Sequence, residues 1–460
     1  MPDPLEAIRA VVGDAGLITG EAVRARPGDW SGRTSCGAKA VVRPRDAAEL
    51  AEVMKLCTAA RQPVVPAGGL TGLAHGADAN EADVMISFER MRAIEAIDPV
   101  AMTMTVEAGV PLQAVHEAAA EQGLIYAVDL GARGSCTIGG NIATNAGGNS
   151  VIRYGMTREN VLGVEAVLAD GTIVSSMNAM LKNNAAYDLK QLFIGSEGTL
   201  GLVTRAVLRL RPAPTSEATA ILAIKDFENV KRVFGLASKR LGSLLSSFEV
   251  MWREFYELVA VESRKHQAPL PGGHGFYVIL EATGTDDVRD AAMVEALLAE
   301  CFERGFAEDA VLAASKSQRN AIWAIREESE VLIKALAPGV MFDVSLPLPR
   351  MQEFVTGMRA ALAAEWGDDV RSLVYGHIGD SNLHLIVSPR PWSDAAKKRV
   401  EEIVYTQLGG FGGSMSAEHG VGTEKREWLH VSRSAEEIAL MKQLKALLDP
   451  HGLLNRGKVL

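Results

Sequence analysis

Residues 134–148 read GSCTIGGNIATNAGG, and this glycine-rich stretch says more about the fold than any other part of the chain. Its density of Gly, Asn, Ser and Thr suits neither a helix nor a regular strand, so we expect a long, ordered loop. Two shorter glycine-rich turns, PAGGLTG at 66–72 and GSEGTLG at 195–201, stand beside expected strands. Backbone N–H groups can approach a phosphate closely where glycines leave no side chain in the way. Any one of these loops could be a plain structural turn, but the three together predict a phosphate-bearing cofactor.

Two common nucleotide-binding motifs are absent from the sequence. The first loop is not GxGxxG, and LAHGADANEADVMISF follows it, which indicates a turn and a strand. A Rossmann fold requires a helix at that point. The sequence also has no GK followed by Ser or Thr, so it contains no Walker loop. The cofactor is therefore expected in a different fold.

Predicted elements on both sides of Pro212–Pro214 indicate two α+β domains joined by a proline-containing linker. Asp46 and Glu49 are placed as a capping box at the start of a helix. We expect a first domain over residues 1–214, a second over 215–440, and a tail over 441–460 that packs back on the first. Expected strands lie at 63–66, 84–88, 102–108, 219–224 and 275–281, a hairpin at 161–174 turns at Asp170–Gly171, and expected helices lie at 111–122, 226–240 and 286–304.

Composition restricts the partners and the cellular location. The net charge of −10 without clustered Lys and Arg argues against a nucleic-acid partner and favours a small molecule. Four dispersed cysteines form no CxxC pair, so neither a disulfide framework nor an iron–sulfur cluster is expected. No apolar stretch is long enough for a membrane helix, and the first residues do not resemble a targeting signal. These features predict a cytoplasmic protein that does not span a membrane.

Two segments gather residue types that bind metals. In GHIGDSNLH, residues 376–384, His377 ends one apolar strand and His384 begins the next, so a hairpin would bring the imidazoles side by side. In SAEHGVG, residues 416–422, Glu418 stands next to His419 in a tightly turning segment. Two histidines and a carboxylate suit Zn²⁺, Mn²⁺, Co²⁺ or Fe²⁺ and leave positions open for a substrate. The alternative is that both histidines are partly buried and satisfied by the backbone.

The three glycine-rich loops resemble, almost position for position, the flavin domain of the vanillyl-alcohol oxidase type, in which FAD lies extended. The run 129–201 is most similar to the D-lactate and D-2-hydroxyglutarate dehydrogenase branch, and the resemblance covers essentially the whole chain. It implies an α+β fold with an FAD-binding domain followed by an α+β substrate (cap) domain. Some relatives attach FAD through a histidine of the first loop; Leu70 stands there and His75 lies just beyond, so non-covalent FAD is implied. The implied FAD contacts are Pro66, Gly68, Gly69, Leu70, Thr71, Gly72, Leu73, Leu130, Gly131, Ser135, Thr137, Ile138, Gly140, Asn141, Thr144, Asn145, Glu197, Gly201, Val203 and Asn455.

The same resemblance assigns roles in a hydride transfer. It implies that His377, His384 and Glu418 bind the divalent ion, with zinc preferred, and that His419 is the base. A secondary alcohol has a very high pKa, so its proton must be stabilised or removed before a hydride can leave the carbon. A metal lowers that pKa, His419 accepts the proton, and FAD takes the hydride. Arg326 resembles the family's carboxylate clamp, and the implied substrate contacts also include Asn382 and Lys458. The alternative for Arg326 is an exposed helix residue paired with Glu330.

The sequence departs from the glutarate-type enzymes at three implied substrate contacts. Where those enzymes carry Thr, Lys and Asn, this chain has Glu330, Met341 and Ile386. Loss of a cation and gain of an acid disfavour a dicarboxylate, so a D-lactate-like or larger apolar D-2-hydroxy acid is expected, with D-2-hydroxyglutarate as the alternative. The implied partners are an electron acceptor, either a quinone, an electron-transfer flavoprotein or a cytochrome, and a second copy in a homodimer. A metallohydrolase and a non-catalytic flavoprotein subunit are the alternatives from other classes.

Overall fold

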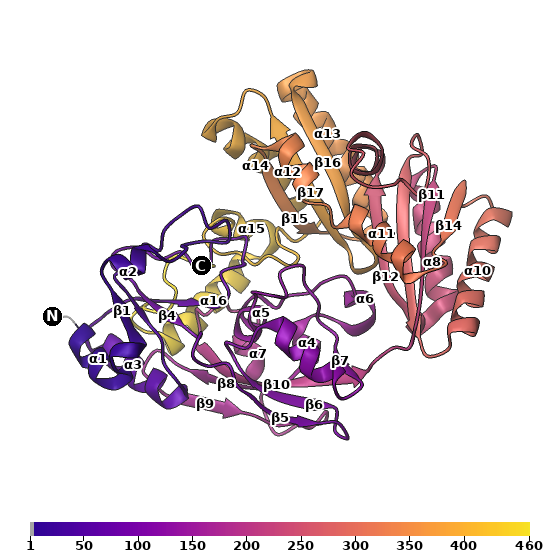
Figure 1. Cartoon of the computed structure of the whole chain (residues 1–460). Helices are drawn as coiled ribbons and strands as arrows, with labels where there is room; N and C mark the ends of the chain where they lie inside the picture. Colours follow the sequence, from indigo (N-terminus) through magenta and orange to yellow (C-terminus); the bar gives the residue numbers. More distant parts are fainter. Residues whose placement is uncertain (1–3) are drawn as a thin grey trace. The chain divides into compact units, whose positions relative to one another are not determined.

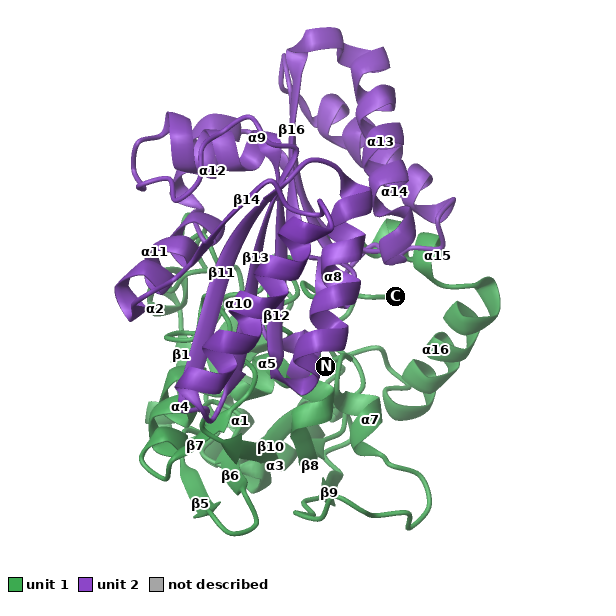
Figure 2. Ribbon diagram, turned by 90° about the vertical axis from the view of Figure 1, so that its right-hand side faces the viewer, with its two compact units in different colours: residues 1–148, 154–213, 418–460 green, residues 149–153, 214–417 purple. Residues whose placement is uncertain are grey.

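The structure, a computed structural model, describes residues 4–460, so the first three residues of the expected first domain lie outside the described range. The chain divides into two compact units, coloured separately in Figure 2. Unit 1 holds the chain up to Gly148, Tyr154–Ala213 and Glu418–Leu460; unit 2 holds Asn149–Arg153 and Pro214–Ala417. Within residues 4–460, no helix combines the length and the apolar character needed to cross a membrane.

The first sheet of unit 1 has the strand order β1–β2–β4–β3, and Figure 1 labels β1 and β4 in the indigo part of the chain. Strands β2 and β3 both run parallel to β4, while β1 pairs antiparallel with β2. Helix α3 (Ala47–Ala59) crosses from β2 to β3, and the Asp46 side chain caps it by accepting the Glu49 N–H. Glu49 in turn accepts the N–H of Arg45, so the predicted cap forms with its return bond shifted by one residue. The strands are β1 (Leu17–Thr19), β2 (Ala40–Val42), β3 (Val64–Ala67) and β4 (Val84–Ser87).

The second sheet of unit 1 is antiparallel, with the order β5–β6–β10–β8–β9 and β7 paired to β10. The predicted hairpin is confirmed: β8 pairs with β9, and Thr172 N–H donates to Asp170 in the connecting turn. Helices α4 (Leu112–Ala120) and α5 (Ile138–Thr144) belong to the same unit. The strands are β5 (Ile94–Asp98), β6 (Thr103–Glu107), β7 (Leu124–Tyr126), β8 (Val161–Val167), β9 (Ile173–Ser176) and β10 (Leu202–Pro212).

Unit 2 is built on one seven-stranded antiparallel sheet with the order β14–β11–β13–β12–β16–β17–β15. The predicted strands at 219–224 and 275–281 correspond to β11 and β13, and the predicted helices at 226–240 and 286–304 to α8 and α10. Strand β12 was not expected; it reads LSSFEVMW, and all eight of its residues are buried. The strands are β11 (Ser216–Ile224), β12 (Leu245–Trp252), β13 (Phe276–Gly284), β14 (Asp309–Leu312), β15 (Val340–Ser345), β16 (Val370–His377) and β17 (Asn382–Pro389).

Helices cover both faces of this sheet. On one face, Phe248 of β12 packs against Phe234 of helix α8, and Phe342 of β15 packs against Tyr405 of helix α14. On the other face, helix α11 brings Arg326 to the side chain of Glu249. Figure 2 shows α8 and α10 in front of the strands and α13 beside α14. The helices are α8 (Phe227–Leu241), α10 (Asp287–Glu303), α11 (Lys316–Arg326), α12 (Glu330–Leu336), α13 (Met351–Trp366) and α14 (Asp394–Gly409).

The division into units differs from the expected boundaries at two places. Residues 149–153 belong to unit 2, where the Asn149 carbonyl accepts the Ser247 hydroxyl. The chain returns to unit 1 at Glu418 rather than near residue 440, because the Val421 and Gly422 N–H groups donate to Glu197. The end of the chain also lies in unit 1, with Asn455 N–H donating to the Val64 carbonyl. Helix α16 (Ala435–Leu448) precedes that contact.

Candidate active site

Two of the glycine-rich loops meet backbone to backbone in unit 1. A Cβ atom on Gly69 would lie 1.8 Å from the Ser135 carbonyl oxygen, and one on Gly68 would lie 2.5 Å from Thr137 Oγ1. No side chain fits at either position, so only glycine allows this approach. The Thr137 side chain also accepts the Gly140 N–H and caps helix α5, so the expectation that residues 134–148 form a loop without a helix is wrong: Ile138–Thr144 are helical because Thr137 provides an N-cap. The sequence therefore places the start of a helix beside the end of strand β3.

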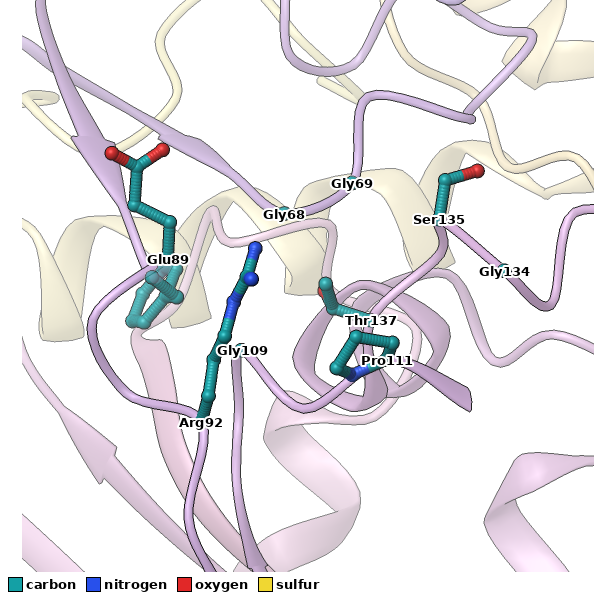
Figure 3. A pocket seen from close by; sticks show the side chains of 10 residues that line it. Gly68, Gly69, Glu89, Arg92, Gly109, Pro111, Gly134, Ser135 and Thr137 are labelled. Atoms are coloured by element: carbon teal, nitrogen blue, oxygen red, sulfur yellow. The ribbon is translucent and has the colours of Figure 1, made fainter. Parts of the chain in front are cut away.

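A cavity of about 330 Å³ lies at this junction (Figure 3). Four of the implied FAD contacts line it, from both loops, and Figure 3 shows Arg92 extending beside Gly68. Glu89 is also in the wall, but its carboxylate pairs with Arg26 and Arg43, so its charge is neutralised. Glycine backbone and a cation are what a diphosphate requires, so the residues present fit FAD. The lining residues are Gly68, Gly69, Phe88, Glu89, Arg92, Gly109, Pro111, Gly134, Ser135 and Thr137.

Other implied FAD contacts surround this junction within unit 1. Leu70, within the first loop, and Asn145, which ends helix α5, both adopt positive φ angles, 55° and 52°. A Cβ on Gly198 would lie 2.5 Å from the Pro66 ring, so the third loop also packs against β3. Ile138, Gly140, Asn141 and Thr144 belong to α5, Leu130 and Gly131 precede the second loop, Thr71, Gly72 and Leu73 follow Leu70, and Gly201 and Val203 stand at the start of β10.

Glu197 ties the third loop to the segment that carries Glu418 and His419. Its carboxylate accepts the N–H groups of Val421 at 2.7 Å and Gly422 at 2.9 Å. Its carbonyl accepts the side-chain amide of Asn455 at 2.7 Å. Burial raises the pKa of Glu197, while the two backbone N–H groups act in the opposite direction. This carboxylate, implied as an FAD contact, is thus engaged in holding the backbone just beyond His419.

The predicted histidine hairpin forms in unit 2. His377 ends β16 and His384 lies near the start of β17, with Tyr375 directly opposite His384. The two imidazole centroids are 5.2 Å apart with an angle of 81° between the rings. The expectation that the hairpin brings the imidazoles side by side is therefore confirmed.

The strand register places the candidate residues of unit 2 on one face of the sheet. Residues directly opposite each other, and residues two apart on a strand, share a face. Glu249 is opposite His377, Asp343 is opposite His384, and Met341 is opposite Ile386. The shared face therefore carries Glu249, Met341, Asp343, Tyr375, His377, Asn382, His384 and Ile386.

Arg326 is held on this face by Glu249, a residue that the sequence did not single out. The guanidinium donates to Glu249 Oε2 from Nε at 3.0 Å and lies above the Tyr375 ring at 4.6 Å. The other carboxylate oxygen accepts from His377 Nδ1 at 2.7 Å. Burial acts to raise the pKa of Glu249, but His377 and Arg326 outweigh it and hold the pKa below its ordinary value.

The alternative in which Arg326 is an exposed residue paired with Glu330 is wrong. Arg326 is buried, and Glu330, which is 81% exposed, accepts instead from Lys265 Nζ at 2.6 Å. The difference arises because helix α11 ends at Arg326 and a new helix, α12, begins at Glu330. The one-turn spacing that would pair the two residues on a continuous helix does not apply.

The remaining implied substrate contacts differ in their surroundings. Asn382 is buried, and neither atom of its side-chain amide has a hydrogen-bond partner within residues 4–460. A buried amide without partners costs free energy, so an additional polar group is expected beside it. Met341 is half exposed, whereas Ile386 packs into the core of unit 2. Lys458 lies in unit 1, where its ammonium donates to the Asp78 carbonyl at 2.6 Å.

Glu418 and His419 begin the last segment of unit 1. Glu418 Oε1 accepts the N–H of Gly148, at the end of the second glycine-rich loop, at 3.1 Å. Gly420 and Gly422 both have positive φ angles, 79° and 51°, so the chain turns sharply directly after His419. The preceding residue, Ala417 of unit 2, donates its N–H to the Asp343 carboxylate at 3.1 Å.

Comparison with known proteins identifies the class. Residues 38–176 match the family described as "FAD binding domain", and residues 213–459 match "FAD linked oxidases, C-terminal domain". Among solved structures, p-cresol methylhydroxylase is similar with a TM-score of 0.77 at 14% identity, covering 99% of this chain and 96% of that one. An alkyldihydroxyacetonephosphate synthase is similar with a TM-score of 0.74 at 16% identity, covering 99% and 86%. The predicted α+β fold of the vanillyl-alcohol oxidase type is therefore confirmed.

Comparison with curated relatives shows to which family of FAD-linked enzymes the chain belongs. D-2-hydroxyglutarate dehydrogenase of Xanthomonas citri pv. viticola is 41% identical over 94% of this chain and 91% of its own length. The mitochondrial D-2-hydroxyglutarate dehydrogenase of Bos taurus is 36% identical over 100% of this chain and 83% of its own. The chain therefore belongs to the FAD-linked D-2-hydroxyacid dehydrogenase family, and the metallohydrolase alternative finds no support.

Proposed function

We propose that this flavoenzyme oxidises a D-2-hydroxy acid to the 2-oxo acid with His377, His384 and Glu418 holding a divalent ion and His419 acting as base. The observation that carries the proposal is the single sheet face on which Arg326, His377 and His384 gather around Glu249 and Asp343. FAD, when bound, supplies the hydride acceptor that no side chain can provide. The residues of the chain supply orientation, charge and a proton acceptor.

The donor set of the proposed metal site fits zinc, with manganese, cobalt and iron as alternatives. Two imidazoles and one carboxylate are borderline ligands that leave coordination positions open. His377 donates through Nδ1 to Glu249, which leaves Nε2 as its ligand atom. Glu418 follows Ala417 directly in the chain, and Ala417 is hydrogen-bonded to Asp343, the strand partner of His384. Chain connectivity thus supports Glu418 as the third ligand. A bound ion there would lower the pKa of the substrate hydroxyl.

Arg326 is proposed to bind the substrate carboxylate. Its guanidinium is buried and lies over the aromatic ring of Tyr375. Nη2 of Arg326 is 3.4 Å from Nε2 of His377. A planar fork of donors suits a carboxylate better than a point charge does. The unpaired amide of Asn382, on the same face, is proposed to donate to a substrate oxygen.

The substrate side chain is proposed to be apolar, as in D-lactate or a larger D-2-hydroxy acid. Met341 and Ile386 face each other on β15 and β17 and offer a thioether and an alkyl group without a cation. The names of the relatives support D-2-hydroxyglutarate as the second candidate. Glu330 is also proposed as a substrate contact, although its carboxylate already forms an ion pair with Lys265. The role of Lys458 in substrate binding also stays a proposal.

A panel of D- and L-2-hydroxy acids with a dye acceptor tests this function. We expect turnover with D-isomers only, and higher kcat/KM for D-lactate-like or larger apolar acids than for D-2-hydroxyglutarate. Met341→Lys should raise kcat/KM for D-2-hydroxyglutarate, because it restores a cation opposite Ile386. Turnover of L-isomers alone would contradict the proposal, and a clear preference of the unaltered protein for D-2-hydroxyglutarate would select the second candidate.

We expect FAD to be bound without a covalent link. Leu70 occupies the position of the linking histidine, and His75 Nδ1 lies 2.9 Å from Asp78 Oδ2, an interaction with a neighbour in its own loop. Purified protein should be yellow, and acid precipitation should leave all flavin in the supernatant as intact FAD. Flavin that stays with the precipitated chain after washing would disprove this expectation.

The acceptor that reoxidises FAD is proposed to be a separate quinone, electron-transfer flavoprotein or cytochrome. Turnover of the purified chain with an artificial acceptor would separate a complete dehydrogenase from a subunit that needs a partner for chemistry. A homodimer and a cytoplasmic location are further proposals from the sequence, and the Bos taurus relative is named as mitochondrial. Analytical sedimentation of the purified protein tests whether it forms a homodimer.

A further inference from the structure

We propose that Glu249 is a positioning residue that couples the carboxylate clamp Arg326 to the metal ligand His377. The inference rests on the proposed function, because it takes Arg326 and His377 in the roles given above. It adds a residue that touches neither substrate nor cofactor and comes from a strand, β12, that carries no other candidate.

One oxygen of Glu249 fixes the orientation of His377. Oε1 accepts from His377 Nδ1 at 2.7 Å, and the two residues are directly opposite on β12 and β16. A carboxylate bonded to one ring nitrogen keeps the proton there and turns the other nitrogen outward as a ligand. Nε2 is therefore the ring nitrogen of His377 that carries the lone pair and would bind the ion, and Arg326 Nη2 lies 3.4 Å from it.

The other oxygen fixes Arg326. Oε2 accepts from Nε at 3.0 Å and pairs with Nη2 at 2.9 Å, and the Tyr375 ring supports the guanidinium from one side. Both bonds use the Nε–Nη2 edge of the fork, which leaves the two N–H groups of Nη1 for a substrate carboxylate. Nη2 is also 3.4 Å from His377 Nε2, so the clamp stands beside the ligand atom.

Glu249 thus sets the spacing between two groups that act on adjacent atoms of a 2-hydroxy acid. The carboxylate belongs under Arg326, and the hydroxyl one carbon away belongs near the ligand atom of His377. A shift of the clamp relative to the ligand would misplace the substrate, and small misplacements reduce catalysis strongly. Glu249 is 1% exposed, so water cannot replace either bond.

The same sheet supplies a matched control. Glu281 of β13 is also buried and also binds an arginine, Arg319, from Nε at 2.8 Å. It also accepts from Trp323 Nε1 at 2.9 Å and from the Thr219 hydroxyl, and none of these three partners is a histidine. Removing its charge disturbs a Glu–Arg pair of the same helix α11 that touches neither His377 nor Glu249, so it reports any general loosening of that helix.

Glu249→Gln, Glu281→Gln and His384→Ala should be compared with the unaltered protein, each loaded with FAD. Zinc affinity is measured by competition with a chromophoric chelator, and kcat and KM separately by dye reduction. We expect Glu249→Gln to bind zinc about 10- to 100-fold more weakly, and to show a raised KM for the hydroxy acid. Glu249→Asp should recover part of both, and Glu281→Gln should match the unaltered protein in both.

Zinc affinity and KM in Glu249→Gln equal to those of the unaltered protein would overturn the inference, provided His384→Ala has lost zinc. In that case the proposed function stands and only the role of Glu249 falls. Equal losses in Glu281→Gln would also overturn it, since they would reflect general weakening of unit 2. If the unaltered protein binds no zinc, manganese, cobalt or iron, the metal site itself is wrong and the inference falls with it.

Discussion

Exhaustive removal of divalent metal is expected to abolish turnover while FAD stays bound. His377 and His384 belong to the sheet of unit 2, whereas the implied FAD contacts belong to the loops of unit 1. Removing the metal from the two histidines therefore leaves the FAD contacts intact. Without the ion, the substrate hydroxyl keeps its ordinary high pKa and the hydride cannot leave. Activity and flavin absorbance are measured on the same chelated sample, with metal content from elemental analysis.

Recovery on adding back one metal at a time identifies the ion and controls for damage by the chelator. His384→Ala provides a genetic counterpart, with lowered metal occupancy and an unchanged flavin spectrum. Full activity in a sample shown to contain no metal would remove the assignment of His377, His384 and Glu418 as ligands. Loss of FAD together with the metal would show that the two sites depend on one another.

The parts of the site that the sequence predicts are those encoded locally. Three glycine-rich loops predicted the cofactor class, because each needs backbone approach within a few residues. The histidine hairpin was equally predictable, since two apolar strands flank a short turn between His377 and His384. The helices at Asp226 and Asp286 carry their own capping residues, and both caps form.

The parts that the sequence missed depend on contacts between distant residues. Strand β12 is buried on both faces, but it contains Ser246, Ser247 and Glu249. These polar residues interrupt the apolar pattern by which a buried strand is predicted. The partners of Glu249 lie 77 and 128 positions further along the chain, so no local pattern joins them. The return to unit 1 at Glu418 depends likewise on Glu197, more than 200 positions earlier.

The burial of Arg326 could not be predicted because its partner, the carboxylate of Glu249, was not identified from the sequence. An arginine at the end of a helix is ordinarily exposed, and the sequence offered Glu330 as a convenient partner. Glu249 could be identified as the partner only from the sheet order, which places β12 beside β16. A polar residue inside an otherwise apolar stretch such as FEVMW is the feature that could have suggested it.

His419→Ala is expected to keep metal and FAD and to lose about 10²- to 10⁴-fold in turnover, the usual effect of a positioned proton acceptor. Glu418 supplies the carboxylate, and its Oε1 is directed to the Gly148 N–H. The next residue can point elsewhere because Gly420 and Gly422 turn the chain directly after it. His419 is therefore proposed to receive the hydroxyl proton rather than to bind the ion.

The measurement is the rate of flavin reduction in a single turnover, which isolates the chemical step from reoxidation. His430→Ala is the matched control: that histidine is exposed, its Nδ1 lies 2.9 Å from the Glu427 carbonyl, and its loss should leave the rate unchanged. If His419→Ala loses its metal while His384→Ala keeps it, the roles of ligand and base are exchanged. If His419→Ala reduces flavin at nearly the unaltered rate, the hydroxyl proton leaves by another group, and the proposed role of His419 is wrong.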